Sequence, residues 1–131
     1  MEIYEILMSE AKRAKGFSYS PYSNFSVGAA LLCADGSIYT GCNVENASFS
    51  PTCCAERVAI FKAISEGKRE FKAIAISGSS KNGKEELCYP CGVCRQVLCE
   101  FCAADLDIVL CDANGISVIK LGELLPKAFK L

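Results

Sequence analysis

The chain has 131 residues, which is the length of one domain and long enough to build a substantial core. About half of the residues are apolar (51%), yet no uninterrupted apolar run approaches the ~18–20 residues that a membrane span needs. The net charge is −1, with 14 basic residues scattered among 15 acidic ones. This balance argues against a nucleic-acid polymer as partner, because a phosphate-tracking surface needs clustered Lys and Arg.

The N-terminal stretch, Met1 to Glu5, is acidic and lacks the basic start, apolar stretch and cleavage site of a signal peptide. We therefore expect a cytoplasmic protein, with no membrane as partner. In that reducing compartment the 10 cysteines indicate metal binding or catalysis rather than disulfides. The sequence has no histidine, which excludes Ser–His–Asp and Cys–His catalysis.

The first half of the chain alternates between regular patterns and turn-forming segments. Apolar residues at helical spacing predict an amphipathic helix over residues 2–15, which Gly16 ends. A turn-forming stretch rich in Ser then leads to Phe25. A hairpin follows, whose two predicted strands are residues 27–33 and 38–42.

The second half begins with a helical pattern over residues 54–66. Apolar residues lie on nearly every side of this helix, so we expect it to be buried. The remaining predicted elements are a strand over residues 73–77, a loop over 78–89, a helix after Pro90, strands over 106–110 and 116–120, and a short helix interrupted at Pro126. The order of strands and helices across residues 38–110 indicates an α/β domain, in which helices pack on the faces of a sheet.

Three cysteines and one acid have the spacing of a water-activating metal site. Cys54, Cys91 and Cys94 can supply three thiolates to zinc, which leaves one of its four positions for water. Glu56 can lie beside the metal without binding it, and there a carboxylate can take and redeliver a proton of the bound water. Both cysteine groups fall at predicted helix starts, whose partial positive charge lowers thiol pKa values. Arg57 is a candidate donor to the thiolates.

Two other metal sites fit the cysteine spacing. The run from Cys88 to Cys99 is close to an iron–sulfur motif, although it departs from the ferredoxin spacing. A structural zinc site would take Cys88 or Cys53 as a fourth ligand. Neither alternative needs Glu56, although the helix dipole alone favours an acid in a first turn. The other cysteines are expected to pack in the core as small hydrophobic residues: Cys33, Cys42, Cys99, Cys102 and Cys111. Cys99 and Cys102 have the Cys-x₂-Cys spacing of metal ligands, but packing is the favoured interpretation.

The stretch Cys54 to Arg57, followed by Pro90-Cys91-Gly92-Val93-Cys94-Arg95-Gln96, resembles the zinc signature of the cytidine deaminase family. Cysteine in place of histidine as first ligand is similar to the short-chain, homotetrameric members. Residues 21–30, 41–47 and 123–129 also match, so the resemblance covers nearly the whole chain. It implies a single domain over residues 1–131, with three α/β/α layers around a mixed sheet of about five strands.

The resemblance also implies roles in substrate binding. Asn43 and Glu45 would hydrogen-bond the ribose 3′-hydroxyl, which both donates and accepts. Phe25 would pack on the pyrimidine or the sugar. The backbone N–H of Ala55, at the start of a helix, would bind the 2-oxygen of the base.

The implied reaction is hydrolysis of free cytidine and 2′-deoxycytidine to uridine and 2′-deoxyuridine with release of ammonia, in pyrimidine salvage and with Zn²⁺ as cofactor. Glu56 would deliver one proton from the water to N3 and would then carry a second proton to the departing amine. The resemblance also implies a homotetramer, in which the positions of Phe49 and Phe129 reach a neighbouring subunit's site. A deaminase for a nucleoside antibiotic such as blasticidin S is the alternative within the same fold, and the pair of Asn43 and Glu45 argues against it.

Overall fold

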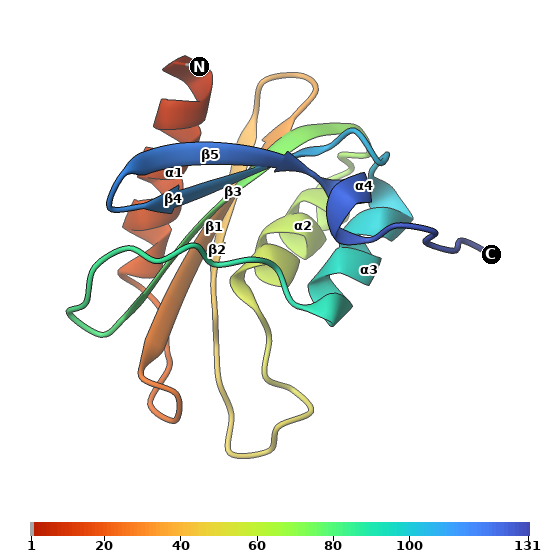
Figure 1. Cartoon of the computed structure of the whole chain (residues 1–131). Helices are drawn as coiled ribbons and strands as arrows, with labels where there is room; N and C mark the ends of the chain where they lie inside the picture. The colour runs from red at the N-terminus through yellow and green to blue at the C-terminus, as the bar shows by residue number, and fades with distance from the viewer. Residues whose placement is uncertain (1) are drawn as a thin grey trace.

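The computed structural model describes residues 2–131 and has a five-stranded sheet with four helices among the described residues. The elements in chain order are α1 (Glu2–Lys15), β1 (Phe25–Cys33), β2 (Ile38–Cys42), α2 (Ala55–Ser65), β3 (Phe71–Ser80), α3 (Gly92–Phe101), β4 (Asp107–Asp112), β5 (Gly115–Lys120) and α4 (Leu121–Leu124) (Figure 1). Each predicted helix and strand is present, with bounds that differ by a few residues.

The sheet is mixed and has the strand order β2-β1-β3-β4-β5. β1 is antiparallel to both β2 and β3, and β4 is antiparallel to β5. β3 and β4 are parallel, and α3 lies in the connection between them, as a parallel pair requires. The predicted mixed sheet of about five strands is confirmed.

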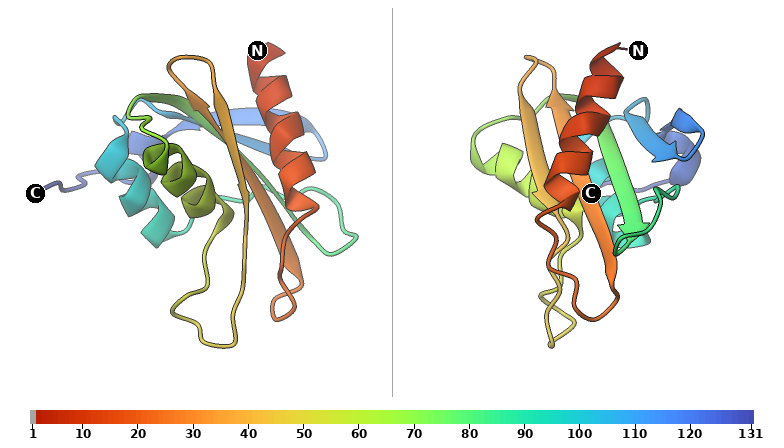
Figure 2. Two further views of the ribbon diagram at one scale, coloured as in Figure 1. Left: turned by 180° about the vertical axis from the view of Figure 1, so that it is seen from behind. Right: turned by 90° about the vertical axis from the view of Figure 1, so that its left-hand side faces the viewer.

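Helices cover both faces of the sheet. α1 packs on one face, and α2 and α3 lie side by side on the other (Figure 2). Successive strand residues point to opposite faces, so β1 supplies Ala29 and Leu31 to the core under α2, and Ala30 and Leu32 to the core under α1. The predicted three-layer arrangement is therefore confirmed.

Two sequence expectations are wrong in detail. The loop expected from residue 78 begins later, because β3 continues to Ser80 by pairing with the start of β1. The helix expected to be buried all round is buried on one side only, since Phe61 of α2 is 46% exposed. The sheet covers only one side of this helix, so apolar composition overstated its burial. None of the helices in residues 2–131 has the length and apolar character to cross a membrane.

Candidate metal centre

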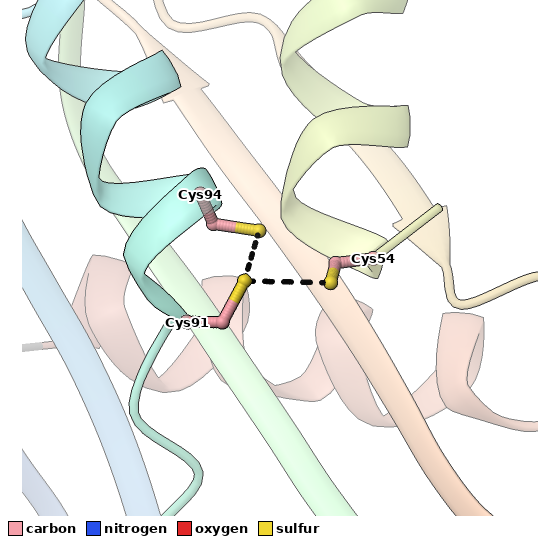
Figure 3. Close-up of side chains that lie close together, drawn as sticks. All are labelled: Cys54, Cys91 and Cys94. Atoms are coloured by element: carbon pink, nitrogen blue, oxygen red, sulfur yellow. Dashed lines mark hydrogen bonds between the residues drawn. The ribbon is translucent and has the colours of Figure 1, made fainter. Parts of the chain in front are cut away.

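Two helix starts bring three cysteines together. Cys54 is the residue before α2, Cys91 is the residue before α3, and Cys94 lies in the first turn of α3. The two preceding residues have extended backbone, with ψ angles of 154° and 170°. Neither thiol caps its own helix, so both are free to turn toward the space between the helices (Figure 3).

The sulfur atoms converge closely enough to share one ion. The Sγ atoms of Cys54 and Cys91 are 3.8 Å apart, and those of Cys91 and Cys94 are 3.5 Å apart. All three lie within 4.8 Å of one another. Soft thiolates in this number fit Zn²⁺ and leave its fourth position open.

Glycine on β2 allows α2 to reach this position. A Cβ atom on Gly41 would lie 2.6 Å from the carbonyl oxygen of Ala55 and 2.7 Å from the nitrogen of Ala59, closer than real contacts allow. Any side chain at Gly41 would therefore push the first turns of α2, and Cys54 with them, away from the sheet.

A partly buried arginine and the helix starts favour thiolate at this site. Arg57 Nη2 donates a hydrogen bond to Cys54 Sγ at 3.4 Å. The pKa of Cys54 is lowered to about 5, because its sulfur accepts hydrogen bonds from the Cys94 thiol and from Arg57. The pKa of Cys94 is raised in turn, since its proton is shared with Cys54, and the pKa of Arg57 is raised by the same sulfur. Metal binding needs both sulfurs as thiolates, so a metal ion would displace the proton that Cys54 and Cys94 share, whereas Arg57 keeps its own.

Glu56 lies beside the thiols and is almost completely buried, with 4% of its surface exposed. Burial raises its pKa to about 7, and the negative charge of Cys54 adds to this effect, whereas Arg57 opposes it. A carboxyl group with a pKa near neutrality can both accept and release a proton under ordinary conditions. This property suits a proton carrier rather than a structural acid.

The structure separates the other cysteines from the cluster. Among residues 2–131, Cys54, Cys91 and Cys94 form a metal-ligand group that does not include Cys53 or Cys88. Cys99 lies toward the other end of α3, where it lines a separate hollow. The geometry therefore favours a three-thiol site over the four-cysteine zinc and iron–sulfur alternatives.

Cys88 nevertheless lies close to the site, which the sequence did not indicate. A Cβ atom on Gly78 would lie 2.9 Å from Cys88 Sγ and 3.1 Å from Phe25 Cε2, so both side chains pack over this glycine of β3. Burial raises the pKa of Cys88 to about 12, and the charge of Glu56 contributes. Cys88 is thus a neutral residue that lies over Gly78 with Phe25 and near enough to Glu56 to feel its charge. No local sequence signal could have found it, because the contact depends on how the chain returns to β3.

Asn43 is occupied within the chain. Its Oδ1 accepts hydrogen bonds from the nitrogen of Val27 at 3.0 Å and from the hydroxyl of Ser18, and its Nδ2 donates to the oxygen of Phe25 at 2.9 Å. These contacts fix the amide orientation and hold the start of β1. One N–H of Nδ2 is left for a further partner.

Glu45 also organises the segment before β1. Its Oε1 accepts hydrogen bonds from the backbone nitrogens of Tyr22 at 2.9 Å and Ser23 at 3.1 Å. The hydroxyl of Ser23 donates to Oε2, and this contact holds the pKa of Glu45 below its usual value. Asn43 and Glu45 are therefore not simply solvated loop residues.

The two aromatic residues expected to reach a neighbouring subunit are exposed. Phe49 is 84% exposed in the segment between β2 and α2, which extends away from the sheet (Figure 1). Phe129 is 65% exposed in the C-terminal tail, where its carbonyl oxygen accepts a 3.3 Å hydrogen bond from Gln96 of α3. Neither ring packs in the core of the single chain.

Comparison with known proteins agrees with this geometry. Residues 1–110 match the family described as the cytidine and deoxycytidylate deaminase zinc-binding region. A cytidine deaminase of Sporosarcina psychrophila is 48% identical over 126 residues, covering 95% of this chain and 90% of that protein. A crystal structure of cytidine deaminase from Burkholderia pseudomallei has a TM-score of 0.87 at 45% identity, covering 95% of this chain and 98% of that one. The chain therefore belongs to the cytidine deaminase family, and it is a hydrolase of that type.

Proposed function

We propose that residues 1–131 form a single deaminase domain that hydrolyses free cytidine and 2′-deoxycytidine to uridine and 2′-deoxyuridine, releasing ammonia. One observation carries this proposal: a buried carboxyl group, Glu56, lies beside three thiols that converge from two helix starts. The relatives described above are named as cytidine deaminases, which supports the same substrate class.

Zn²⁺ is the proposed cofactor, held by Cys54, Cys91 and Cys94. When bound, it lowers the pKa of water and so supplies the nucleophile for attack at C4 of the base. Three thiolates carry more negative charge than the ion neutralises. The hydrogen bond from Arg57 to Cys54 withdraws some of that charge and so preserves the acidity that the reaction needs.

Glu56 is the proposed proton carrier. It takes a proton from the attacking water and passes it to N3 of the cytosine ring, which makes C4 more electrophilic. It then takes the proton of the new C4 hydroxyl group and gives it to the amine, so that the C4–N bond breaks, ammonia leaves and the C4 carbonyl of uridine forms. A pKa of about 7 supports both directions of transfer.

The nucleoside is proposed to lie between the metal centre and the start of β1. Phe25 packs on the pyrimidine or sugar, and the N–H of Ala55 at the start of α2 binds the 2-oxygen of the base. Asn43 and Glu45 hydrogen-bond the ribose 3′-hydroxyl. Their contacts within the chain support this role, because they hold both polar groups in fixed orientations beside Phe25.

The active form is proposed to be a homotetramer. Exposed aromatic rings at Phe49 and Phe129 support this, since each lies on a segment that projects from the chain. In the assembly each ring would complete the site of a neighbouring subunit. A role in pyrimidine salvage and a cytoplasmic location remain predictions from the sequence.

The test is the ultraviolet spectrum of cytidine during incubation with catalytic amounts of the purified, zinc-containing protein. We expect complete conversion to the spectrum of uridine, and the same change with 2′-deoxycytidine. An unchanged spectrum with a folded protein that retains zinc would contradict the proposal. Faster turnover of blasticidin S than of cytidine would favour the antibiotic-deaminase alternative.

A further inference from the structure

A partly buried ion pair lies on the face of the sheet that α1 covers. Lys15, in the last turn of α1, pairs with Glu85, in the segment that connects β3 to α3. Their side chains are only 17% and 18% exposed, unlike those of ordinary surface ion pairs. Neither residue belongs to the metal centre or to the proposed nucleoside site.

Two buried serines complete the network. Ser77 Oγ donates a hydrogen bond to Glu85 Oε1 at 2.6 Å, and Lys15 Nζ donates to Ser79 Oγ at 3.0 Å as well as to Glu85. The serines are 0% and 4% exposed and lie on β3. Buried polar groups are costly unless they are paired, so this network favours one position of Glu85 against β3.

The segment that carries Glu85 wraps around the edge of β3. The nitrogen of Glu86 donates to the oxygen of Gly78 at 2.9 Å, in an antiparallel bridge. Glu85 lies on the α1 side of this bridge, whereas Cys88 packs over Gly78 on the opposite side, facing the metal centre. Three residues later the same segment delivers Cys91.

Other contacts hold the two ends of this segment. At its start, the nitrogen of Lys81 donates to the oxygen of Asn24 at 2.8 Å. At its end, Arg95 Nε donates to the oxygen of Pro90 at 2.7 Å. Glu85 lies between these anchors, where it ties the segment to α1 across the sheet edge.

We propose that the Lys15–Glu85 pair, with Ser77 and Ser79, positions the segment that carries Cys88 and Cys91, and so makes α1 part of the support of the metal centre from the opposite face of the sheet. Both members are positioning residues, because neither contacts the thiols. The inference rests on the proposed function only in taking zinc as the ion that the thiols hold.

The experiment measures zinc release from the purified, zinc-loaded chain to an excess of a coloured chelator, together with the melting temperature of each zinc-free chain. The variants are Glu85→Gln, Lys15→Met and the double variant, with Lys15→Arg as the conservative substitution. Lys68→Met is the matched control. Lys68 also forms an ion pair, at 2.7 Å with Asp35, but this pair lies after the C-terminal end of β1 and outside the Lys15–Glu85 network. All release rates are taken well below the lowest melting temperature.

Glu85→Gln and Lys15→Met are each expected to release zinc about 10-fold faster than the wild-type chain, the lower end of the effects seen for residues that support metal ligands. The double variant should release zinc no faster than the faster single variant, because the two residues act as one unit. Lys15→Arg keeps the charge and should stay within about twofold of the wild type. Lys68→Met should match the wild type.

The inference would be overturned if Glu85→Gln and Lys15→Met lowered the melting temperature but released zinc at the wild-type rate. It would also fail if Lys68→Met accelerated release equally. Should Glu85→Gln not fold, Ser77→Ala removes one hydrogen bond and leaves both charges paired; an acceleration of about threefold is then expected, and none would contradict the inference.

The zinc measurement separates this inference from the proposed function. A wild-type chain that retains zinc but does not convert cytidine would contradict the proposed reaction and leave the positioning role intact. A wild-type chain that converts cytidine, with variants that keep zinc as tightly, would contradict the positioning role alone. A wild-type chain that binds no zinc would overturn both.

Discussion

Helix α3 carries a Cys-x₂-Cys pair near each end, and the two pairs have opposite surroundings. Cys91 and Cys94, at its start, meet Cys54 from the start of α2. Cys99 and Cys102, at its end, line a hollow whose other walls include Leu121. Beside the start of α3, the pKa of Cys54 is lowered to about 5 because its sulfur accepts hydrogen bonds from the Cys94 thiol and from Arg57, whereas at the end of α3 burial raises the pKa of Cys102 to about 12.

The difference follows from what surrounds each sulfur, namely hydrogen-bond donors at Cys54 and burial at Cys102, and the direction of the helix acts in the same sense. Unpaired N–H groups give a helix start roughly +0.5 of an elementary charge, and unpaired carbonyl groups give its end the opposite sign. Cys54, before α2, accepts hydrogen bonds from the Cys94 thiol and from Arg57, which stabilise its thiolate, and the two helix starts add positive charge on the same side. At the end of α3, Lys130 lowers the pKa of Cys102 by less than burial raises it. The Cys-x₂-Cys spacing by itself is therefore not sufficient evidence for a metal site. It indicates one when helix starts, a cation and a third thiol lie at the same place.

The largest expected effect comes from removing Cys54, the thiol that joins Cys91 and Cys94 at the start of α3. Cys54→Ala should lose stoichiometric zinc and all measurable cytidine turnover, and should unfold at lower urea concentration, since metal affinity contributes to folding. Zinc content, ultraviolet turnover assays and urea titration check the three effects.

Cys53→Ala is the matched control, because Cys53 is the adjacent residue but lies outside the thiol cluster. It should keep its zinc and its activity. Full zinc in Cys54→Ala, with loss in Cys53→Ala, would show that the neighbouring cysteine is the ligand.

The second-largest effect is expected from replacing Glu56, the buried acid beside the thiol cluster, which distinguishes the start of α2 from the end of α3. Glu56→Gln keeps the shape of the side chain but removes the titrating group, so turnover should fall about 10³-fold while zinc stays bound. Steady-state kinetics and metal analysis on the same preparation check this. Wild-type rates in this variant would remove Glu56 from the proposed chemistry.

A smaller difference is expected in thiol reactivity. In the zinc-free chain at pH 7, iodoacetamide should label Cys54 about 10²-fold faster than Cys102. The thiolate fractions differ by about 10⁵, and the lower nucleophilicity of an acidic thiol offsets about 10³ of this. Mass spectrometry of the digested chain measures both rates.

The pH dependence of labelling has a definite sign. A lowered pKa keeps Cys54 ionised above about pH 5, so its rate should be flat from pH 7 to 9 and fall as the pH drops through about 5. The rate at Cys102 should rise throughout this range. Zinc should protect Cys54, and equal rates at both sites would contradict the comparison.

Local sequence patterns could predict the start of each helix and the cysteines there. Helix periodicity and the spacing of Cys54, Cys91 and Cys94 are properties of short segments, and the structure brings the three residues together as expected. The five strands were predictable for the same reason, and the mixed character of the sheet followed from the family resemblance, whereas the strand order was not predicted.

Contacts that depend on the path of the chain could not be predicted. Cys88 meets Phe25 over Gly78 only because the segment after β3 wraps around the edge of that strand. The Lys15–Glu85 pair joins residues that are 70 positions apart. Nothing in the local sequence, including its periodicity, distinguishes Lys15 or Glu85 from the other charged residues of the chain.

The smallest expected effect belongs to the end of α3. Cys102→Ala removes one buried sulfur next to an existing hollow, so the free energy of unfolding should fall by about 1 kcal/mol. Zinc content and turnover should not change. Cys94→Ala is the matched substitution on the same helix and should lose zinc. Urea titration of zinc-loaded chains measures the stability, and metal analysis measures the retention. Equal zinc loss in both variants would mean that the two ends of α3 share one metal function, and the contrast between their surroundings would then have no functional meaning.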